Sequence, residues 1–199
     1  MTETAWQVQS LLLGYPDAHL LGLRPVLRES VATLPAPLGT PLEVFLNHVD
    51  ATSPTELAAS YVATFDHRKR FSPYLTYFVH GDTRKRGMAL LRFKNTYRAA
   101  GLVLDEGELP DHVSVVLEFA AISPTGRTLL EEHRAGLELL RLGLREASSP
   151  WAPVLDSVSA TLSPLRGLDR ETIAGLAAQG PPEEEVGLTP YLMPREGAR

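Results

Sequence analysis

A hydroxyl residue followed by a proline and then by a glutamate occurs twice in this chain, and this pattern constrains the fold more than any other feature. Thr40-Pro41-Leu42-Glu43 and Ser53-Pro54-Thr55-Glu56 each offer a capping hydroxyl, a proline at the first helical position and a glutamate that can hydrogen-bond back to the cap. Apolar residues follow each device at steps of three and four. The sequence therefore predicts two amphipathic helices, beginning after Thr40 and after Ser53.

The same helical spacing continues along the rest of the chain, and no run of alternating apolar and polar β-branched residues indicates a strand. A short helix is expected to end at Gly14, and Pro25 should interrupt a second element near its start. A basic helix should end at Gly101, and residues 113–122 are apolar nearly all round, as expected for a central helix. One longer helix is predicted over residues 129–144.

The last predicted helix begins with Asp169 as its cap and ends at Gly180. The remaining residues hold prolines and an acidic run without helical spacing. We therefore expect an all-α, single-domain bundle of about nine or ten helices, with a TorD/DmsD-like fold once the resemblance described below is included. The helical chaperone domain would span residues 1–180, and residues 181–199 would form a flexible Pro/Glu-rich C-terminal tail.

Several absences in the 199-residue sequence limit its location and chemistry. No run of about 18 apolar residues is present, and the first residues lack the basic start and apolar stretch of a secretory signal, which predicts a cytoplasmic protein with no integral membrane segment. There is no cysteine, which excludes disulfides, thiolate catalysis and iron-sulfur ligation. No two of the six histidines share the spacing of a helical metal site, and nucleotide and hydrolase motifs are absent. We expect no enzyme activity, no metal and no cofactor.

Charge is unevenly distributed along the chain, whose net charge is -5. Between Asp66 and Arg98 nine basic residues face two acidic ones, so this segment carries +7 and the remainder -12. Aromatic and basic residues interleave from Tyr61 to Phe78. Such a surface can grip an apolar peptide while guanidinium groups hold its carboxylates. The alternative is that the aromatic residues are core and the basic ones a solvated face.

A second segment, Glu108-Leu109-Pro110-Asp111-His112, places an acid and a histidine at the expected start of the apolar helix. In the first turn, Asp111 would complement the helix dipole and His112 would be packing.

These two segments resemble a known family. YVATFDHRKRFSPYLTYFVHGDTRKRGMALLRFKNTYRAAG (residues 61–101) and ELPDHVSVVLEFAA (108–121), with LLLGYPD (11–17), are similar to the respiratory nitrate reductase molybdenum cofactor assembly chaperones of the NarJ type, within the TorD/DmsD group of redox-enzyme maturation chaperones. Glu108, Pro110, Asp111 and His112 resemble the acidic-proline-Asp-His motif of the wider group, with the proline immediately before the aspartate.

The resemblance implies an assembly chaperone that binds the N-terminal segment of the apo nitrate reductase catalytic alpha subunit. It would assist molybdenum cofactor insertion, delay membrane docking until maturation is complete, and have proteins of molybdenum cofactor biosynthesis as further partners. The expected partner-binding groove has an apolar floor and a charged rim. The floor would comprise Tyr61, Phe65, Tyr74, Tyr77, Leu91 and Phe93, and the rim Asp66, Arg70, Asp82, Arg84 and Arg86.

Two other functions are compatible with the sequence. In the first, Arg84, Lys85 and Arg86 hold the phosphates of the molybdenum cofactor directly, so that the protein is a cofactor carrier. In the second, the +7 segment neutralises the phosphates of a nucleic acid. The overall acidity, and the apolar residues among the basic ones, argue against nucleic acid as a partner.

Overall fold

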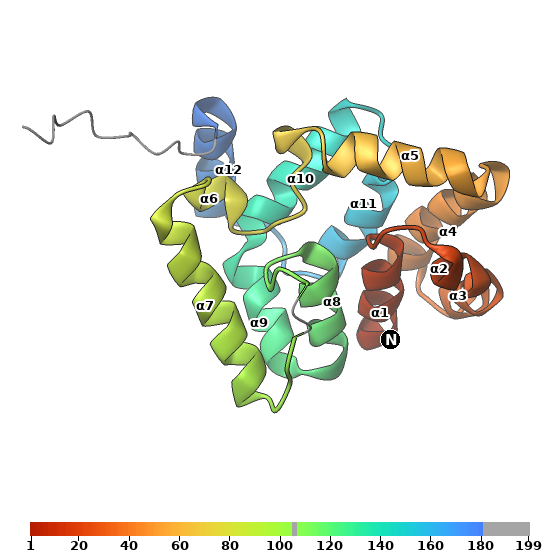
Figure 1. Cartoon of the computed structure of the whole chain (residues 1–199), viewed down its shortest axis with the longest axis horizontal. Coiled ribbons are helices and arrows are strands. Elements are labelled where there is room, and N and C mark those ends of the chain that lie inside the picture. The colour runs from red at the N-terminus through yellow and green to blue at the C-terminus, as the bar shows by residue number, and fades with distance from the viewer. Residues whose placement is uncertain (105–106, 181–199) are drawn as a thin grey trace, which may run out of the picture.

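The structure of the protein is a computed structural model that describes residues 1–104 and 107–180 (Figure 1). The predicted tail, residues 181–199, lies outside the described residues. Within those two ranges the chain forms helices joined by turns and irregular loops, with one isolated bridge. The elements are α1 (Thr2–Leu12), α2 (Ala18–Gly22), α3 (Arg24–Ala32), α4 (Ala36–Ala51), α5 (Pro54–Phe65), η1 (Lys69–Phe71), α6 (Tyr77–His80), α7 (Arg84–Ala99), α8 (Val113–Ile122), α9 (Pro124–Glu132), α10 (Arg134–Glu146), α11 (Ala152–Ala160) and α12 (Gly167–Gln179).

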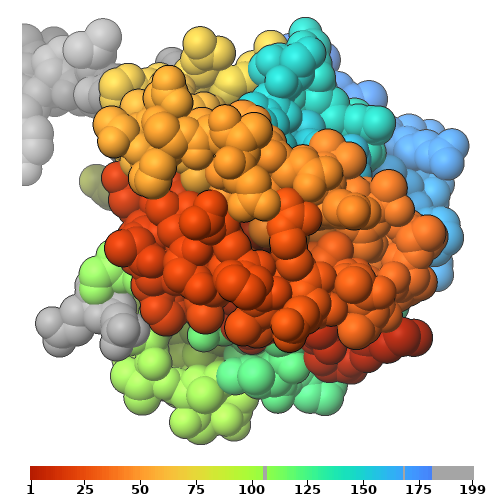
Figure 2. Space-filling view, turned by 90° about the vertical axis from the view of Figure 1, so that its right-hand side faces the viewer, coloured from red at the N-terminus to blue at the C-terminus, as the bar shows by residue number. Residues whose placement is uncertain are grey.

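The core lies where α8, α10 and α11 meet the N-terminal helices. Helix α8 packs against α1 and α9, while α11 packs between α4 and α10. Trp151 is 1% exposed and contacts the rings of Phe45, Tyr61 and Phe65, with ring centroids 5.5 to 5.7 Å away. Aromatic rings at these separations stabilise a core beyond the area they bury. The helices α2 to α5 together cover one continuous face of the molecule (Figure 2).

The apolar helix α8 is central, as predicted, but not on every side. Val113, Val116 and Leu117 are fully buried, whereas Glu118 is exposed and Ile122 is 62% exposed. The outer side of α8 therefore reaches solvent.

Of the two helix starts predicted from a hydroxyl residue followed by proline, one is present and one is not. Ser53 forms the predicted capping box, since its Oγ accepts from the Glu56 amide and its own amide donates to the Glu56 carboxylate. Helix α4, in contrast, begins at Ala36, so Pro41 lies inside the helix. The prediction of a start after Thr40 is wrong because Pro35 and Pro37 already provide an earlier start, and one missing amide inside a 16-residue helix is tolerated.

Further helix boundaries differ from the sequence-based expectation, and the described ranges hold twelve α-helices instead of nine or ten. The predicted helix over residues 129–144 is divided at His133, whose φ of −105° and ψ of 21° leave the helical region. The expected interruption near Pro25 is present, since the second element is divided at Leu23 and Pro25 lies in the first turn of α3. Helix α12 starts at Gly167, so Asp169 is its third residue and accepts from the Arg166 amide, 2.7 Å away.

No helix within residues 1–104 and 107–180 combines the length and the apolar character needed to cross a membrane.

Candidate functional site

Two segments that are far apart in the sequence lie side by side. They are residues 73–76, before α7, and residues 111–113, after it. The amide of Leu75 donates to the carbonyl of Asp111 at 2.9 Å, and the amide of Val113 donates to the carbonyl of Pro73 at the same distance. Tyr74 and His112 form an antiparallel bridge. We call this pairing the 73–76/111–113 junction. It brings the aromatic-basic segment and the acidic-proline-Asp-His motif into one place.

Asp111 is fully buried at this junction. Its Oδ2 accepts from the Thr76 hydroxyl at 2.5 Å and from the Thr76 amide at 3.3 Å. Nη2 of Arg86 lies 3.8 Å from the same oxygen, as an ion pair without a hydrogen bond. A buried carboxylate requires such compensation, because water no longer solvates its charge. The acid of the motif is therefore a structural centre of the junction.

Arg86 joins this centre to the surface. Its guanidinium carbon lies 5.2 Å from the ring centroid of Tyr74 and 5.9 Å from that of Tyr77, in cation-π geometry. Nη1 donates to Asp82 at 3.3 Å, and Asp82 in turn lies 3.6 Å from Nζ of Lys69. The side chain is only 15% exposed, and its Nε and Nη2 have no hydrogen-bond partner among the described residues.

His112 caps α8 and is not part of the helix. The Ser114 amide donates to its Nδ1 at 3.2 Å, and its ring meets that of Tyr74 edge to face with centroids 5.4 Å apart. Burial lowers the pKa of His112 to about 4. Because α8 begins only at Val113, the expectation that Asp111 and His112 occupy its first turn is wrong.

The other motif residues have separate positions. Pro110 is buried, and its carbonyl accepts from the Tyr97 hydroxyl at 2.5 Å, which holds the end of α7 to the residue that precedes the junction. Glu108 is exposed.

Four residues predicted for the floor of the binding groove lie in the core. The exposed fractions of Tyr61, Phe65, Tyr77 and Phe93 are between 1% and 7%. The Tyr61 hydroxyl donates to the Leu13 carbonyl at 3.1 Å, and the Phe93 ring packs on that of His133 at 4.6 Å. Tyr74, by contrast, is half-buried and reaches the surface.

Leu91 is 46% exposed, and Phe93 in the same helix is 1% exposed. Two residues along an α-helix rotate by about 200°, so these side chains leave α7 in nearly opposite directions. The structure does not bring them together in one groove floor.

The predicted rim residues Asp66, Arg70, Asp82 and Arg84 are all exposed. Arg70 forms an ion pair with Glu146 of α10. Arg86 differs from Arg84 and Lys85 in being turned inward to Asp111, so the three basic residues do not share one face.

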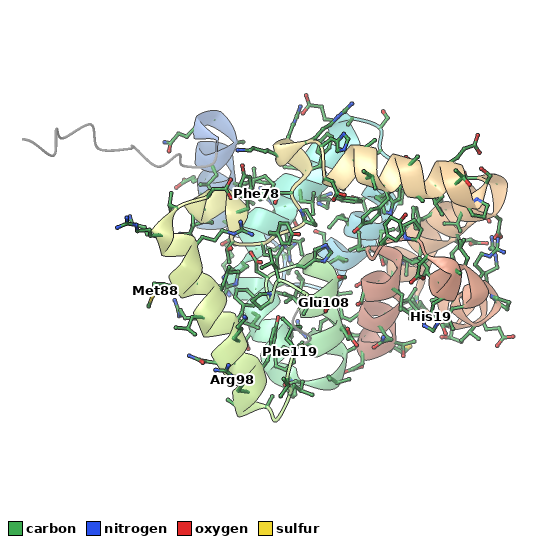
Figure 3. The ribbon with its side chains drawn as sticks, viewed as in Figure 1. His19, Phe78, Met88, Arg98, Glu108 and Phe119 are labelled. Carbon is green, nitrogen blue, oxygen red and sulfur yellow. The ribbon has the colours of Figure 1, made fainter. Side chains whose placement is uncertain are left out.

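Sequence reasoning missed Thr76 and Met88. Nothing in the sequence singles out Thr76, which becomes important only because the junction places it beside Asp111. Met88 could have been found, since it precedes Leu91 by three residues on the same helix. It is 65% exposed and points away from the body of the molecule (Figure 3). We call the outward side of α7, which carries Arg84, Lys85, Met88, Leu91, Arg92 and Asn95, the outer face of α7.

Comparison with a solved structure defines the class of the fold. A crystal structure from Archaeoglobus fulgidus, assigned as a redox enzyme maturation protein, matches 88% of this chain and 93% of its own, with a TM-score of 0.58 and 25% sequence identity. The helical arrangement around the junction is thus similar to that of a redox-enzyme maturation protein, which agrees with the expected TorD/DmsD-like fold.

Comparison with protein families narrows this class. The model of the family described as nitrate reductase delta subunit matches residues 31–156. The chain belongs to the nitrate reductase delta subunit family, and the resemblance to NarJ-type chaperones is confirmed. These 126 residues include the junction and the whole of α7.

Individual relatives cover the chain to different extents. A Bacillus subtilis protein assigned as nitrate reductase molybdenum cofactor assembly chaperone NarJ is 33% identical over 87% of this chain and 95% of its own length. The Escherichia coli K12 chaperone NarJ is 32% identical over 75% of this chain and 65% of its own. The nitrate reductase-like protein NarX of Mycobacterium tuberculosis is 38% identical over 80% of this chain, which spans only 24% of that longer relative.

Proposed function

We propose that this protein is an assembly chaperone for a respiratory nitrate reductase. It binds the N-terminal segment of the apo catalytic alpha subunit, assists molybdenum cofactor insertion, and delays membrane docking until maturation is complete. Membership of the nitrate reductase delta subunit family supports this proposal, as do relatives named as nitrate reductase molybdenum cofactor assembly chaperones. Proteins of molybdenum cofactor biosynthesis are its further partners.

The observation that carries the binding proposal is the outer face of α7. Helix α7 holds six basic residues and no acidic one, and exposes Met88 and Leu91 one turn apart. Exposed apolar side chains surrounded by charges of one sign are typical of a surface that accepts an amphipathic segment of a partner. The apolar residues would hold the apolar side of that segment, and the basic residues would select acidic groups at its edge.

Other predicted rim residues lie at the end of α5 and in η1, and Asp82 links η1 to the start of α7 through its ion pair with Lys69. Arg70 and Asp66 are exposed there, and half-buried Arg86 stacks on Tyr74 of the junction. Because Arg86 is held by Asp82 and Asp111, the surface has a fixed base, which reduces the entropy lost on binding.

A mechanism follows from thermodynamics without any chemical step. A protein that binds the immature alpha subunit more tightly than the mature one holds the immature form by mass action. Cofactor insertion changes this preference and releases the chaperone. An affinity between micromolar and nanomolar is compatible with such release.

Isothermal titration with a synthetic peptide of the alpha subunit N-terminus tests the proposal, at low and at moderate salt. We expect saturable one-to-one binding that persists at moderate salt. Replacing Met88 and Leu91 together by serine should weaken it at least tenfold, since both anchors are lost. The matched control is Val26→Ser, which removes a similarly exposed (58%) apolar side chain from α3, away from α7, and should bind normally.

The two parts of the proposal fail separately. Absence of binding by the unmodified protein at both salt concentrations would contradict the recognition of this segment. Binding that is equally strong in the Met88/Leu91 double variant would retain the function and remove the outer face of α7 as its site. Circular dichroism of each variant checks that the fold is intact.

A further inference from the structure

A cleft of about 470 Å³ lies on a different part of the molecule, between α9, the start of α12 and the connection from α11 to α12. Its volume falls within the range of small-molecule sites, about 300 to 1,000 Å³. Three arginines line it: Arg127 and Arg134 from α9 and α10, and Arg166 immediately before α12. The binding surface proposed above uses none of these residues.

Arg134 is buried in the wall of this cleft, with 8% of its surface exposed. Its Nε donates to Glu138 at 2.8 Å, and its Nη2 donates to the Ser159 hydroxyl at 3.0 Å. These two nitrogens form one edge of the guanidinium group. Nη1, on the opposite edge, is buried and has no hydrogen-bond partner among the described residues. A buried donor without a partner is costly, so the positive charge that Arg134 brings to the cleft wall is only partly compensated by its protein contacts.

The carboxylates of the cleft do not neutralise its arginines by direct pairing. Glu131 accepts from the amide and the hydroxyl of Ser163, both at 2.9 Å, and Asp169 accepts from the backbone amide of Arg166. No ion pair of the described chain involves the side chains of Arg127 and Arg166, which are both exposed. With three arginines against two acids, the lining carries a net charge of +1.

We propose that this cleft binds the phosphate group of a small phosphorylated molecule. Three guanidinium groups around one cavity match a group with three terminal oxygens, whereas a carboxylate offers only two. Arg134 contributes buried positive charge to the wall, and the exposed side chains of Arg127 and Arg166 contact the phosphate. The remaining volume accommodates the organic part of the ligand beside Pro164 and Leu165, which also line the cleft.

The test uses the full chain at constant ionic strength, with ribose 5-phosphate and inorganic phosphate as probes and ribose as the neutral control. Isothermal titration should detect ribose 5-phosphate and not ribose. The double variant Arg127→Gln/Arg166→Gln should bind ribose 5-phosphate at least tenfold more weakly. Both side chains are exposed, so the variant should fold normally. Arg134 is left unchanged because Glu138 depends on it.

The control is Arg98→Gln, which removes an exposed arginine at the end of α7 without touching the cleft. Normal binding by this variant, together with the loss in the double variant, would support the proposal. Equal weakening in both would mean general attraction of anions and would overturn it. Failure of ribose 5-phosphate to bind at millimolar concentration would overturn the proposal as well. This includes the case in which inorganic phosphate binds and ribose 5-phosphate does not.

Discussion

Nη2 of Arg86 lies 3.8 Å from Oδ2 of Asp111, so opposite charges hold the start of α7 against the residues that precede α8. Arg86 is also stacked on Tyr74, which pairs through its backbone with the neighbour of Asp111. The two segments that carry the family resemblance are therefore parts of one physical unit. This unit is a structural centre, and the exposed outer face of α7 lies beside it.

Removing the carboxylate should destabilise the fold strongly. Asp111→Ala leaves the Thr76 amide and hydroxyl without their acceptor and leaves Arg86 with only the exposed Asp82 as a charge partner. Loss of one member of a buried ion pair costs about 3 to 5 kcal/mol. Urea denaturation should show this loss. The double variant Asp111→Ala/Arg86→Met should lose less than the sum of the two single changes, and simple additivity would show that the residues are not coupled.

Gly136 is required by a close approach between α10 and the junction. A Cβ at this position would lie 2.4 Å from the carbonyl oxygen of Leu75, and a backbone atom cannot turn aside as a side chain can. Gly136→Ala should therefore lower the free energy of unfolding by about 1 to 3 kcal/mol. The matched control is Gly175→Ala in α12, where a Cβ would meet no atom within 4 Å beyond the backbone of its own helical turns, and there alanine should stabilise by about 0.5 to 1 kcal/mol. Thermal denaturation of both variants distinguishes steric conflict from helix propensity.

Tyr61 should be a core residue and not a binding residue. Tyr61→Phe removes one hydrogen bond, from the hydroxyl to the Leu13 carbonyl, and should cost about 1 kcal/mol in unfolding free energy. Its affinity for the alpha subunit peptide should equal that of the unmodified protein. A weaker affinity at unchanged stability would instead place the Tyr61 hydroxyl in the binding site.

Stability should fall as the pH is lowered through the titration of His112. Burial lowers the pKa of this histidine to about 4, below its unfolded value of about 6.5, so the unfolded chain takes up the proton first. Stability is therefore complete above about pH 6.5 and declines towards pH 4, by about 3 kcal/mol. Burial also lowers the pKa of His133, which acts in the same direction.

The substitution His112→Asn separates this titration from capping. Asparagine can accept the Ser114 amide in place of the imidazole but binds no proton in this range. Denaturation between pH 4 and 7.5 should show a flatter pH dependence for His112→Asn. The control His19→Asn, at an exposed position in α2, should keep the original slope. An unchanged slope in His112→Asn would contradict the assignment.

Helical spacing and caps predict the fold class because the residues that define each helix are close together in the sequence. Ser53 and Glu56 interact within one turn, and their capping box could be inferred from four residues. The break at His133 could not be inferred in this way, because Leu129, Leu137 and Leu144 keep their helical spacing across it and are all buried. Helix α9 packs on α8, whereas α10 packs on α11 and α12, and such tertiary contacts leave no local pattern in the sequence.

The sequence predicts which region of the chain contains the candidate site, but not which of its residues are exposed or which contact one another. The interleaved aromatic and basic residues mark the correct region, yet the sequence does not separate Phe93, which is core, from Leu91, which is exposed. The contact between Asp111 and Thr76 spans 35 residues, and no local pattern records it. Whether the exposed residues bind the partner remains a prediction.

The pairing of residues 73–76 with 111–113 has a consequence for local opening of the structure. Residues between Leu75 and Asp111 include α7. The hydrogen bonds of the junction join the two ends of this segment, so that it forms a closed loop. Apart from these bonds, α7 is held to the body by the Arg86–Asp111 ion pair, the Tyr97 hydroxyl and the buried rings of Phe93 and Tyr97, the latter 4.7 Å from that of Phe119. We therefore expect the amides of α7 to exchange with solvent by subglobal opening of this closed loop, at a free-energy cost set by these contacts.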